Sequence, residues 1–245
     1  MKMSGQISWK PIASLIRLIM LVCFASILAT PKDVFAQSQT VSEFWPTVNA
    51  RFQLPHKWRA LAFVGLKKGE ENEHQQLNGG LGLARQLRPI LKPHPENNDP
   101  DKEHTFVLGG GYERLQVYQS GTTSNENRVV LQAVYGLRPL SRLLVSDRNR
   151  VELRWRDSGY SARYRNNAQM LYDILVRGFH FSPYGSAEFF YDGGKGEWSR
   201  EQYTAGLELP VGRIVSLQTY YLRQNDTSEP QHLNVAGLTL NMNFK

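Results

Sequence analysis

The chain alternates between polar and apolar side chains from about residue 45 to its end, and a period of two residues is that of a β-strand. In the stretch 147–156, arginine or glutamate occupies every even position from 148 on, while Val151, Leu153 and Trp155 occupy odd positions. Helical periodicity is almost absent after residue 40. The pattern predicts eleven strands, at residues 45–54, 58–67, 75–87, 104–117, 127–138, 143–156, 161–174, 178–191, 198–209, 214–224 and 231–244.

Strands of about ten residues with one polar and one apolar face are typical of barrels in the bacterial outer membrane. No segment after residue 36 has 18 consecutive apolar residues, so helices cannot carry this part across a membrane. Among spanning structures, that leaves a closed barrel, which satisfies every backbone polar group in lipid. We therefore predict an all-β fold, an antiparallel transmembrane outer-membrane β-barrel of 10–12 strands. An even number is usual, which favours twelve, with the missing strand at 37–41 or 87–103.

The expected connections alternate between tight and long, as in barrels whose short turns face the periplasm. Tight turns are expected at 55–57, 139–141, 175–177 and 210–212, with polar loops between them. The segment 88–103 breaks this scheme, because it is long, proline-rich and charged where a short turn is due. We interpret it as a flexible periplasmic excursion. Aromatic residues near the predicted strand ends suggest girdles at both membrane interfaces: Trp45, Trp58, Trp155, Tyr160, Tyr191, Trp198 and Tyr221.

The first 36 residues have the features of a secretory signal peptide. A basic start is followed by the apolar run 18–29 and by Val34-Phe35-Ala36, which ends in a small residue suited to cleavage. The run is shorter than the roughly 20 residues that a spanning helix needs. We therefore divide the chain into a signal peptide, 1–36, and a barrel domain, 37–245. The single cysteine, Cys23, lies in the signal, so the mature chain is expected to have neither disulfide nor thiolate chemistry.

Charge and histidine content exclude several classes of function. The precursor has a formal charge of +7, and removal of the signal peptide leaves about +4. No basic run along the sequence resembles a nucleic-acid-binding arm, so nucleic acid is not an expected partner. The six histidines are scattered without metal-ligand spacing. We expect no metal, no cofactor and no catalytic residue.

Several stretches carry a family resemblance. They are Phe44–Pro46, Trp58, Asp147–Trp155, Ser161–Asn166, Ser182–Tyr184, Glu188–Asp192 and Tyr221–Asn225. Together they resemble the domain-of-unknown-function family numbered 2490, a group of proteobacterial proteins treated as outer-membrane barrels. The resemblance covers most of residues 44–244. It implies a barrel in the outer membrane of a Gram-negative bacterium, and it implies no activity.

If the apolar faces point to lipid, a charged cluster occupies the lumen. Leu153, Leu207 and Leu238 then face outward, while Arg154, Glu208 and Thr239 face inward. Arginine forms forked bonds to carboxylates, so the cluster is expected either to pair and plug the barrel or to line an anion-selective constriction. Its members are Arg148, Arg150, Glu152, Arg154, Arg156, Arg163, Arg165, Glu188, Arg200 and Glu208.

The favoured function is therefore a structural envelope protein or small channel with an arginine-rich lumen, and not an enzyme. Its expected partners are outer-membrane lipid, the barrel-assembly machinery and small anions. Two alternatives stay open. His180-Phe181-Ser182 faintly resembles the His-x-Ser arrangement of lipid A deacylase barrels, which would make the protein an outer-membrane lipid-modifying enzyme. A soluble periplasmic β-sandwich that binds a ligand would also show alternating strands.

Overall fold

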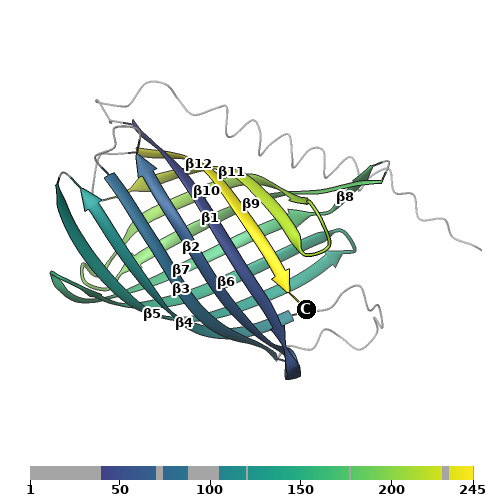
Figure 1. Cartoon of the computed structure of the whole chain (residues 1–245), viewed down its shortest axis with the longest axis horizontal. Helices are drawn as coiled ribbons and strands as arrows, with labels where there is room; N and C mark the ends of the chain where they lie inside the picture. Colours follow the sequence, from purple (N-terminus) through teal and green to yellow (C-terminus); the bar gives the residue numbers. More distant parts are fainter. Residues whose placement is uncertain are drawn as a thin grey trace, which may run out of the picture. The chain divides into compact units, whose positions relative to one another are not determined.

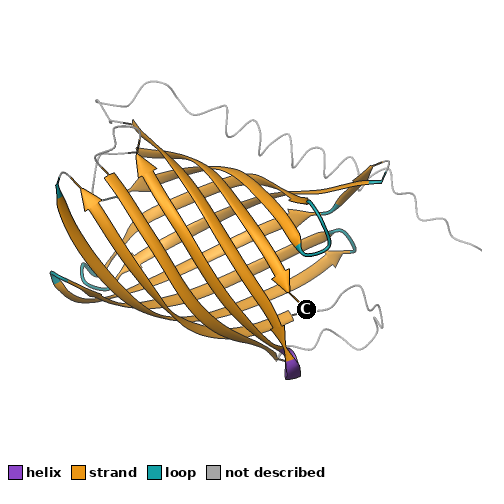
Figure 2. Ribbon diagram, viewed as in Figure 1, coloured by secondary structure: helices purple, strands orange, loops and turns teal. Residues whose placement is uncertain are grey.

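The computed structural model describes residues 40–69, 74–87, 105–119, 121–176, 178–227 and 232–244. The expected signal peptide and the 88–103 segment lie outside these residues. The described part consists almost wholly of strands joined by short turns, with one 3-10 turn, η1 (Pro55–Lys57) (Figure 2). The strands are β1 (Thr40–Leu54), β2 (Trp58–Gly69), β3 (His74–Leu87), β4 (Thr105–Gln119), β5 (Thr122–Leu140), β6 (Leu143–Arg156), β7 (Gly159–Tyr172), β8 (Ile174–Val176), β9 (Phe179–Asp192), β10 (Glu197–Pro210), β11 (Val215–Asp226) and β12 (His232–Phe244).

Eleven of these twelve strands close into a barrel. Each pairs with its neighbours in chain order, β7 pairs directly with β9, and β1 pairs with β12 to complete the ring. The short β8 continues the line of β7 and pairs only with the first residues of β9, so this hairpin projects beyond the barrel wall (Figure 1). The sequence prediction of an all-β barrel with 10–12 strands is confirmed.

The barrel closes through a parallel pair. The pairing of β1 with β12 is parallel, from Thr40 opposite His232 to Phe52 opposite Phe244, and all the other described pairs are antiparallel. An odd number of up-and-down strands forces this arrangement, since the first and last strands then run in the same direction. The expectation of a wholly antiparallel barrel with an even number of strands is therefore wrong, because the wall has eleven strands and one parallel pair.

The connections at the two ends of the barrel differ less in length than the sequence suggests. We call the end with the β1–β2, β5–β6, β8–β9 and β10–β11 connections the turn rim, and the opposite end the loop rim. At the loop rim, β4 reaches Gln119 and β5 begins at Thr122, while Asp157 and Ser158 alone connect β6 to β7. The prediction of long polar loops between the tight turns is wrong at these two places, because the strands extend into them.

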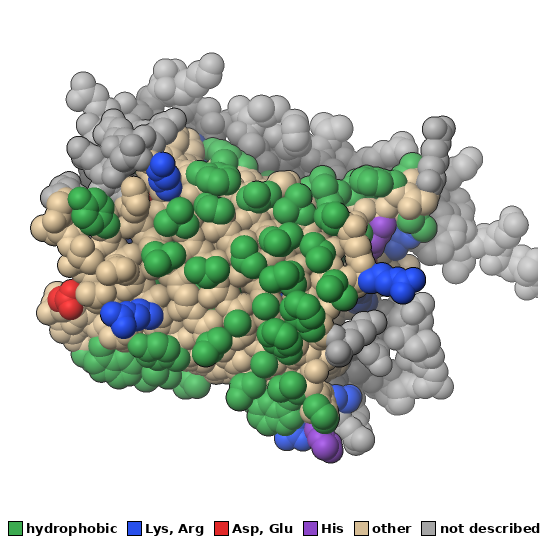
Figure 3. Space-filling model, viewed as in Figure 1, with side chains coloured by type: hydrophobic (Ala, Val, Ile, Leu, Met, Phe, Trp, Pro, Cys, Tyr) green, Lys and Arg blue, Asp and Glu red, His purple; other side chains and the backbone are tan. Residues whose placement is uncertain are grey.

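The two faces of the wall have opposite chemistry. The large apolar side chains on the outer face are exposed, including Leu81 at 69%, Leu131 at 56% and Met170 at 56%. Figure 3 shows apolar side chains spread over the visible wall, with lysine and arginine toward its ends. The strongly buried side chains of the described residues all lie on the inner face, and most of them are polar or charged. This inversion contradicts the β-sandwich alternative, because a sandwich buries its apolar face.

Cross-strand pairing places the predicted residues on the expected faces. Register pairs join Arg154 to Arg128 and Glu208 to Gln218, and the inner face follows these pairs around the ring. Leu153 and Leu207 lie on the opposite, outer face. Among the described residues, no helix is long and apolar enough to cross a membrane.

Aromatic side chains gather on the outer face near both rims. At the loop rim, Trp155 and Tyr160 lie 5.5 Å apart, and Trp198 lies 5.6 Å from Tyr191 (ring centroids). A β-bulge between Trp198 and Arg200 turns the tryptophan outward. Trp58 is exposed beside the turn rim. The expectation for Trp45 is wrong, because its strand position turns it into the lumen.

One group on the outer wall breaks the alternation. Asp147 accepts hydrogen bonds from Asn149 at 2.6 Å and from Asn166 at 2.7 Å, and the Tyr164 hydroxyl donates to Asn149. The four side chains lie on β6 and β7. They satisfy one another, which lowers the cost of placing polar groups on an apolar surface.

Close packing inside the barrel uses glycine. Tyr220 lies opposite Gly237 across the β11–β12 pair, and its ring occupies the space that a Cβ at Gly237 would fill. Aromatic rings over inward-facing glycines fill a barrel interior and pin the strand register.

Candidate functional site: the luminal ion-pair network

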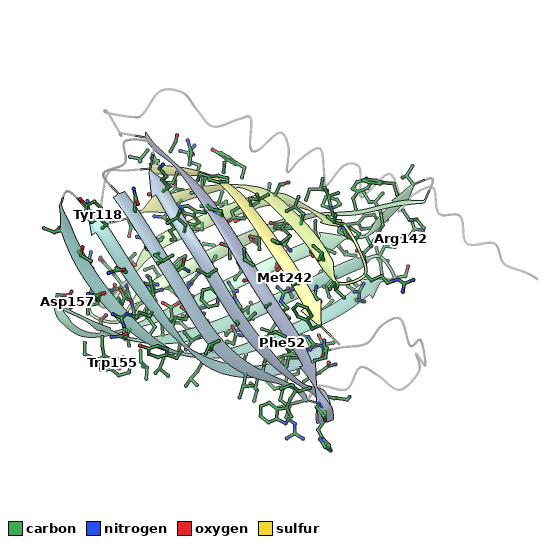
Figure 4. The ribbon with its side chains drawn as sticks, in the orientation of Figure 1. Phe52, Tyr118, Arg142, Trp155, Asp157 and Met242 are labelled. Atoms are coloured by element: carbon green, nitrogen blue, oxygen red, sulfur yellow. The ribbon has the colours of Figure 1, made fainter. Side chains whose placement is uncertain are left out.

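All ten residues of the predicted charged cluster lie on the inner face, and eight of them form one network. The strands that contribute run between the loop rim, marked in Figure 4 by Tyr118 and Asp157, and the turn rim, marked by Arg142. The eight are Arg148, Arg150, Glu152, Arg154, Arg156, Arg163, Arg165 and Glu188.

Glu152 on β6 is the centre of this network. Its side chain is fully buried, with 0% exposed. Nitrogen atoms of four arginines approach its carboxylate, at 2.6 Å from Arg163, 2.8 Å from Arg150, 2.9 Å from Arg165 and 3.9 Å from Arg128. One buried carboxylate therefore holds together three adjacent strands, β5, β6 and β7.

Glu188 extends the network to β9. It accepts hydrogen bonds from Arg165 at 2.8 Å and from Arg148 at 3.0 Å. Arg150 and Arg165 are direct register partners across the β6–β7 pair. Two like charges opposite one another are destabilising. Glu152 lies between these two arginines, and Glu188 accepts a second hydrogen bond from Arg165.

Three members of the network, Glu113, Glu126 and Arg128, were not predicted from the sequence. Glu113 on β4 accepts from Arg150 at 2.7 Å. Glu126 on β5 accepts from Arg128 and Arg154, each at 2.5 Å, and from Arg156 at 3.1 Å. The signal was present, because Glu126 and Arg128 alternate on one face of β5 in the same way as the residues of β6.

The remaining two predicted residues lie outside the network. Arg200 donates to Asp226 at 2.9 Å on the neighbouring strand. Glu208 accepts from the uncharged Ser216 and Gln218, both at 2.8 Å. Among the described ion pairs, none joins Glu208 to an arginine. Period-two alternation assigned its face correctly, but it does not show how far along the barrel two side chains lie from each other.

The wall opposite the network is mainly uncharged. Gln202 donates to Gln224 at 2.7 Å, and Asn49 donates to Asn241 at 2.9 Å across the parallel seam. The lumen therefore has a densely charged side formed by β4 to β9 and a more neutral side formed by the other strands, on which most inward side chains are uncharged. The charged residues on this second side include Glu43, Arg51, Lys67, Arg200, Glu208 and Asp226.

Between the network and the loop rim the lumen opens into a cavity of about 470 Å³, which we call the basic vestibule. Its lining includes eight lysine or arginine residues and three acidic residues, Glu126, Asp192 and Asp226. Lys67 lies in this lining with its ammonium group 3.8 Å from the centroid of the Trp45 ring. Among the described ion pairs, none involves Lys67.

The His180-x-Ser182 pair lies near the turn rim in a different arrangement from that of a catalytic serine. Ser182 donates its hydroxyl proton to Asp173 at 2.7 Å. His180 Nε2 lies 3.7 Å from the same carboxylate oxygen, and the hydroxyl's described partner is the carboxylate. A serine nucleophile needs a base that accepts its proton and a third group that orients the base. This geometry does not support the lipid-enzyme alternative.

The sequence profile of one protein family matches residues 42–234, which is most of the described barrel. The chain belongs to the family described as protein of unknown function (DUF2490). The match agrees with the resemblance found in the sequence, and it carries no activity. A comparison with curated proteins gave no match.

Proposed function

We propose that this DUF2490 protein is an outer-membrane barrel with a filled lumen, which acts as a structural envelope protein and not as an open channel. The observation that carries the proposal is the burial of inward-facing side chains on both sides of the lumen. Glu152 on the charged wall and Asn241 on the neutral wall are both 0% exposed. An open pore would leave such residues in contact with water.

The outer surface supports a location in lipid. Soluble proteins rarely expose large contiguous apolar patches, and outer-membrane barrels carry an apolar band between aromatic girdles. The exposed leucines and the Trp155–Tyr160 and Tyr191–Trp198 pairs fit this description. Outer-membrane lipid and the barrel-assembly machinery are then the proposed partners. N-terminal sequencing of the fractionated protein tests this location, with Gln37 as the expected first residue, and recovery from the soluble periplasm would refute it.

Conductance of the purified, refolded protein in a planar bilayer tests the filled lumen. We expect no current steps from the natural sequence. A variant in which Arg150, Glu152 and Arg165 are all serine removes the centre of the network and should conduct. This variant also shows that folded protein has entered the bilayer. Steady open-channel current from the natural sequence would overturn the proposal.

The second candidate is an anion-selective channel, which the excess of arginine over glutamate in the network favours. Rings of basic side chains select anions in pores. If the natural protein conducts, Arg154→Glu should move the reversal potential from anion toward cation preference. An unchanged reversal potential would exclude a selectivity role for this arginine.

A further inference from the structure

The basic vestibule holds more positive charge than its carboxylates can neutralise. Its own lining has eight cations against three acids. The buried network beneath it adds two arginines and three carboxylates. The residues added from the network are Arg148, Arg150, Glu113, Glu152 and Glu188. With Glu43, whose carboxylate accepts from the Trp45 indole and attracts Lys67, the total is then ten cations against seven acids.

The acids of the vestibule are already occupied. Glu126 binds three arginines, and Asp226 accepts from Arg200 at 2.9 Å and from Gln224 at 2.9 Å. Asp192 accepts the backbone N–H of Gly194 at 2.9 Å within its own turn. Lys67, by contrast, lies against the Trp45 ring, and the Trp45 indole N–H donates to Glu43 at 2.5 Å.

Three guanidinium groups of the vestibule are held around a single ring. The Phe190 centroid lies 4.5 Å from Arg165, 5.4 Å from Arg163 and 5.8 Å from Arg200. Each of the three is also paired with a carboxylate, Arg163 and Arg165 with Glu152 and Arg200 with Asp226, and the contacts with the ring hold these guanidinium groups further in place. The cations are therefore positioned before any ligand arrives, which lowers the entropy cost of binding one.

We propose that the basic vestibule binds a small, multiply charged phosphate compound. Guanidinium groups match the geometry of phosphate oxygens, and a lysine adds a compact point charge. A cavity of about 470 Å³ has the size of a small-molecule site and is too small for a folded macromolecule. The proposal rests on the filled lumen of the proposed function, because the network forms the floor of the vestibule.

Titration calorimetry of the refolded protein in detergent, with inorganic pyrophosphate as the probe, tests this site. Lys67→Gln removes a vestibule cation, and Lys68→Gln is the matched control, since Lys68 is the next residue of β2 and is exposed on the outer face. We expect saturable binding to the natural protein, weakened about ten- to a hundred-fold by Lys67→Gln, as for loss of one charge-assisted contact. Lys68→Gln should leave the affinity unchanged.

Three outcomes would contradict the proposal. Absence of saturable binding at low salt, or equal weakening by both lysine variants, would overturn the site. Binding of citrate as tight as that of pyrophosphate would overturn the phosphate class. Gel mobility before and after heating checks that both variants are folded. Calorimetry in detergent measures binding separately from the bilayer recordings of current. If the natural protein conducts and also binds pyrophosphate, only the filled lumen is refuted. If it does not conduct and does not bind pyrophosphate, only the site is refuted.

Discussion

Replacement of Glu152 by glutamine is the sharpest test of the luminal network. The change keeps the shape of the side chain and removes one negative charge from among four arginines that approach within 3.9 Å. Breaking a buried ion pair by removing one partner typically costs 3–5 kcal/mol, because the other charge stays buried without compensation. Since Glu152 is fully buried, we expect a loss of about 3–5 kcal/mol in the free energy of unfolding.

The matched control is Glu208→Gln. Glu208 also faces the lumen, but its hydrogen bonds come from the uncharged Ser216 and Gln218, and Arg51 attracts it without forming an ion pair. We therefore expect a smaller loss of about 1–2 kcal/mol. Urea titrations of the refolded proteins in lipid bilayers, followed by tryptophan fluorescence, measure both values. Arg163→Met in the Glu152→Gln background should recover part of the loss, because the described ion pair of Arg163 is with Glu152. Equal losses at the two glutamates would refute the reasoning.

Further predictions concern the wall. Leu238→Arg places a charge on the outer face near the middle of β12 and should cost about 2–4 kcal/mol in bilayers. Gln218→Arg on the inner face should cost less, because the new guanidinium would lie beside Glu208; a larger loss at Gln218 would show that the faces are reversed. Gly237→Ala should cost about 1–3 kcal/mol, since its Cβ meets the Tyr220 ring. In a double-mutant cycle, Tyr220→Ala should remove most of that cost, and simple additivity would count against this packing.

Alternation along the sequence predicts the strands and their faces, because adjacent residues of a strand point to opposite sides of a sheet. It therefore assigned Arg154 and Leu153 correctly. It did not reveal the parallel seam, because nothing in the pattern of β1 or β12 specifies which strand lies beside it. The even-number rule describes other barrels. The stretch from Thr40 to Leu54 alternates like the other strands, and its interruption at Pro46, where the pairing with β2 lapses, does not specify a parallel neighbour.

The network was only partly predictable for a related reason. Adjacent strands place Glu152 beside Arg163, a pair that hairpin pairing alone suggests. Contacts that skip a strand, such as Arg150 with Glu113, depend on the length and direction of long side chains inside a curved wall. The outward position of Asp147 was also missed, because its hydrogen bonds to Asn149 and Asn166 form only after β6 and β7 are aligned.

The parallel seam has a consequence for the sidedness of the protein. Because β1 and β12 run in the same direction, Thr40 lies at the loop rim beside His232, whereas Phe244 lies at the turn rim beside Phe52. In any membrane that the barrel spans, the two ends of the barrel domain then face different compartments, whereas a barrel with an even number of strands has both in the same one. If the turn rim faces the periplasm, an epitope placed just before Thr40 is accessible to antibody on intact cells. An epitope after Phe244 is then reached only once the outer membrane has been permeabilised.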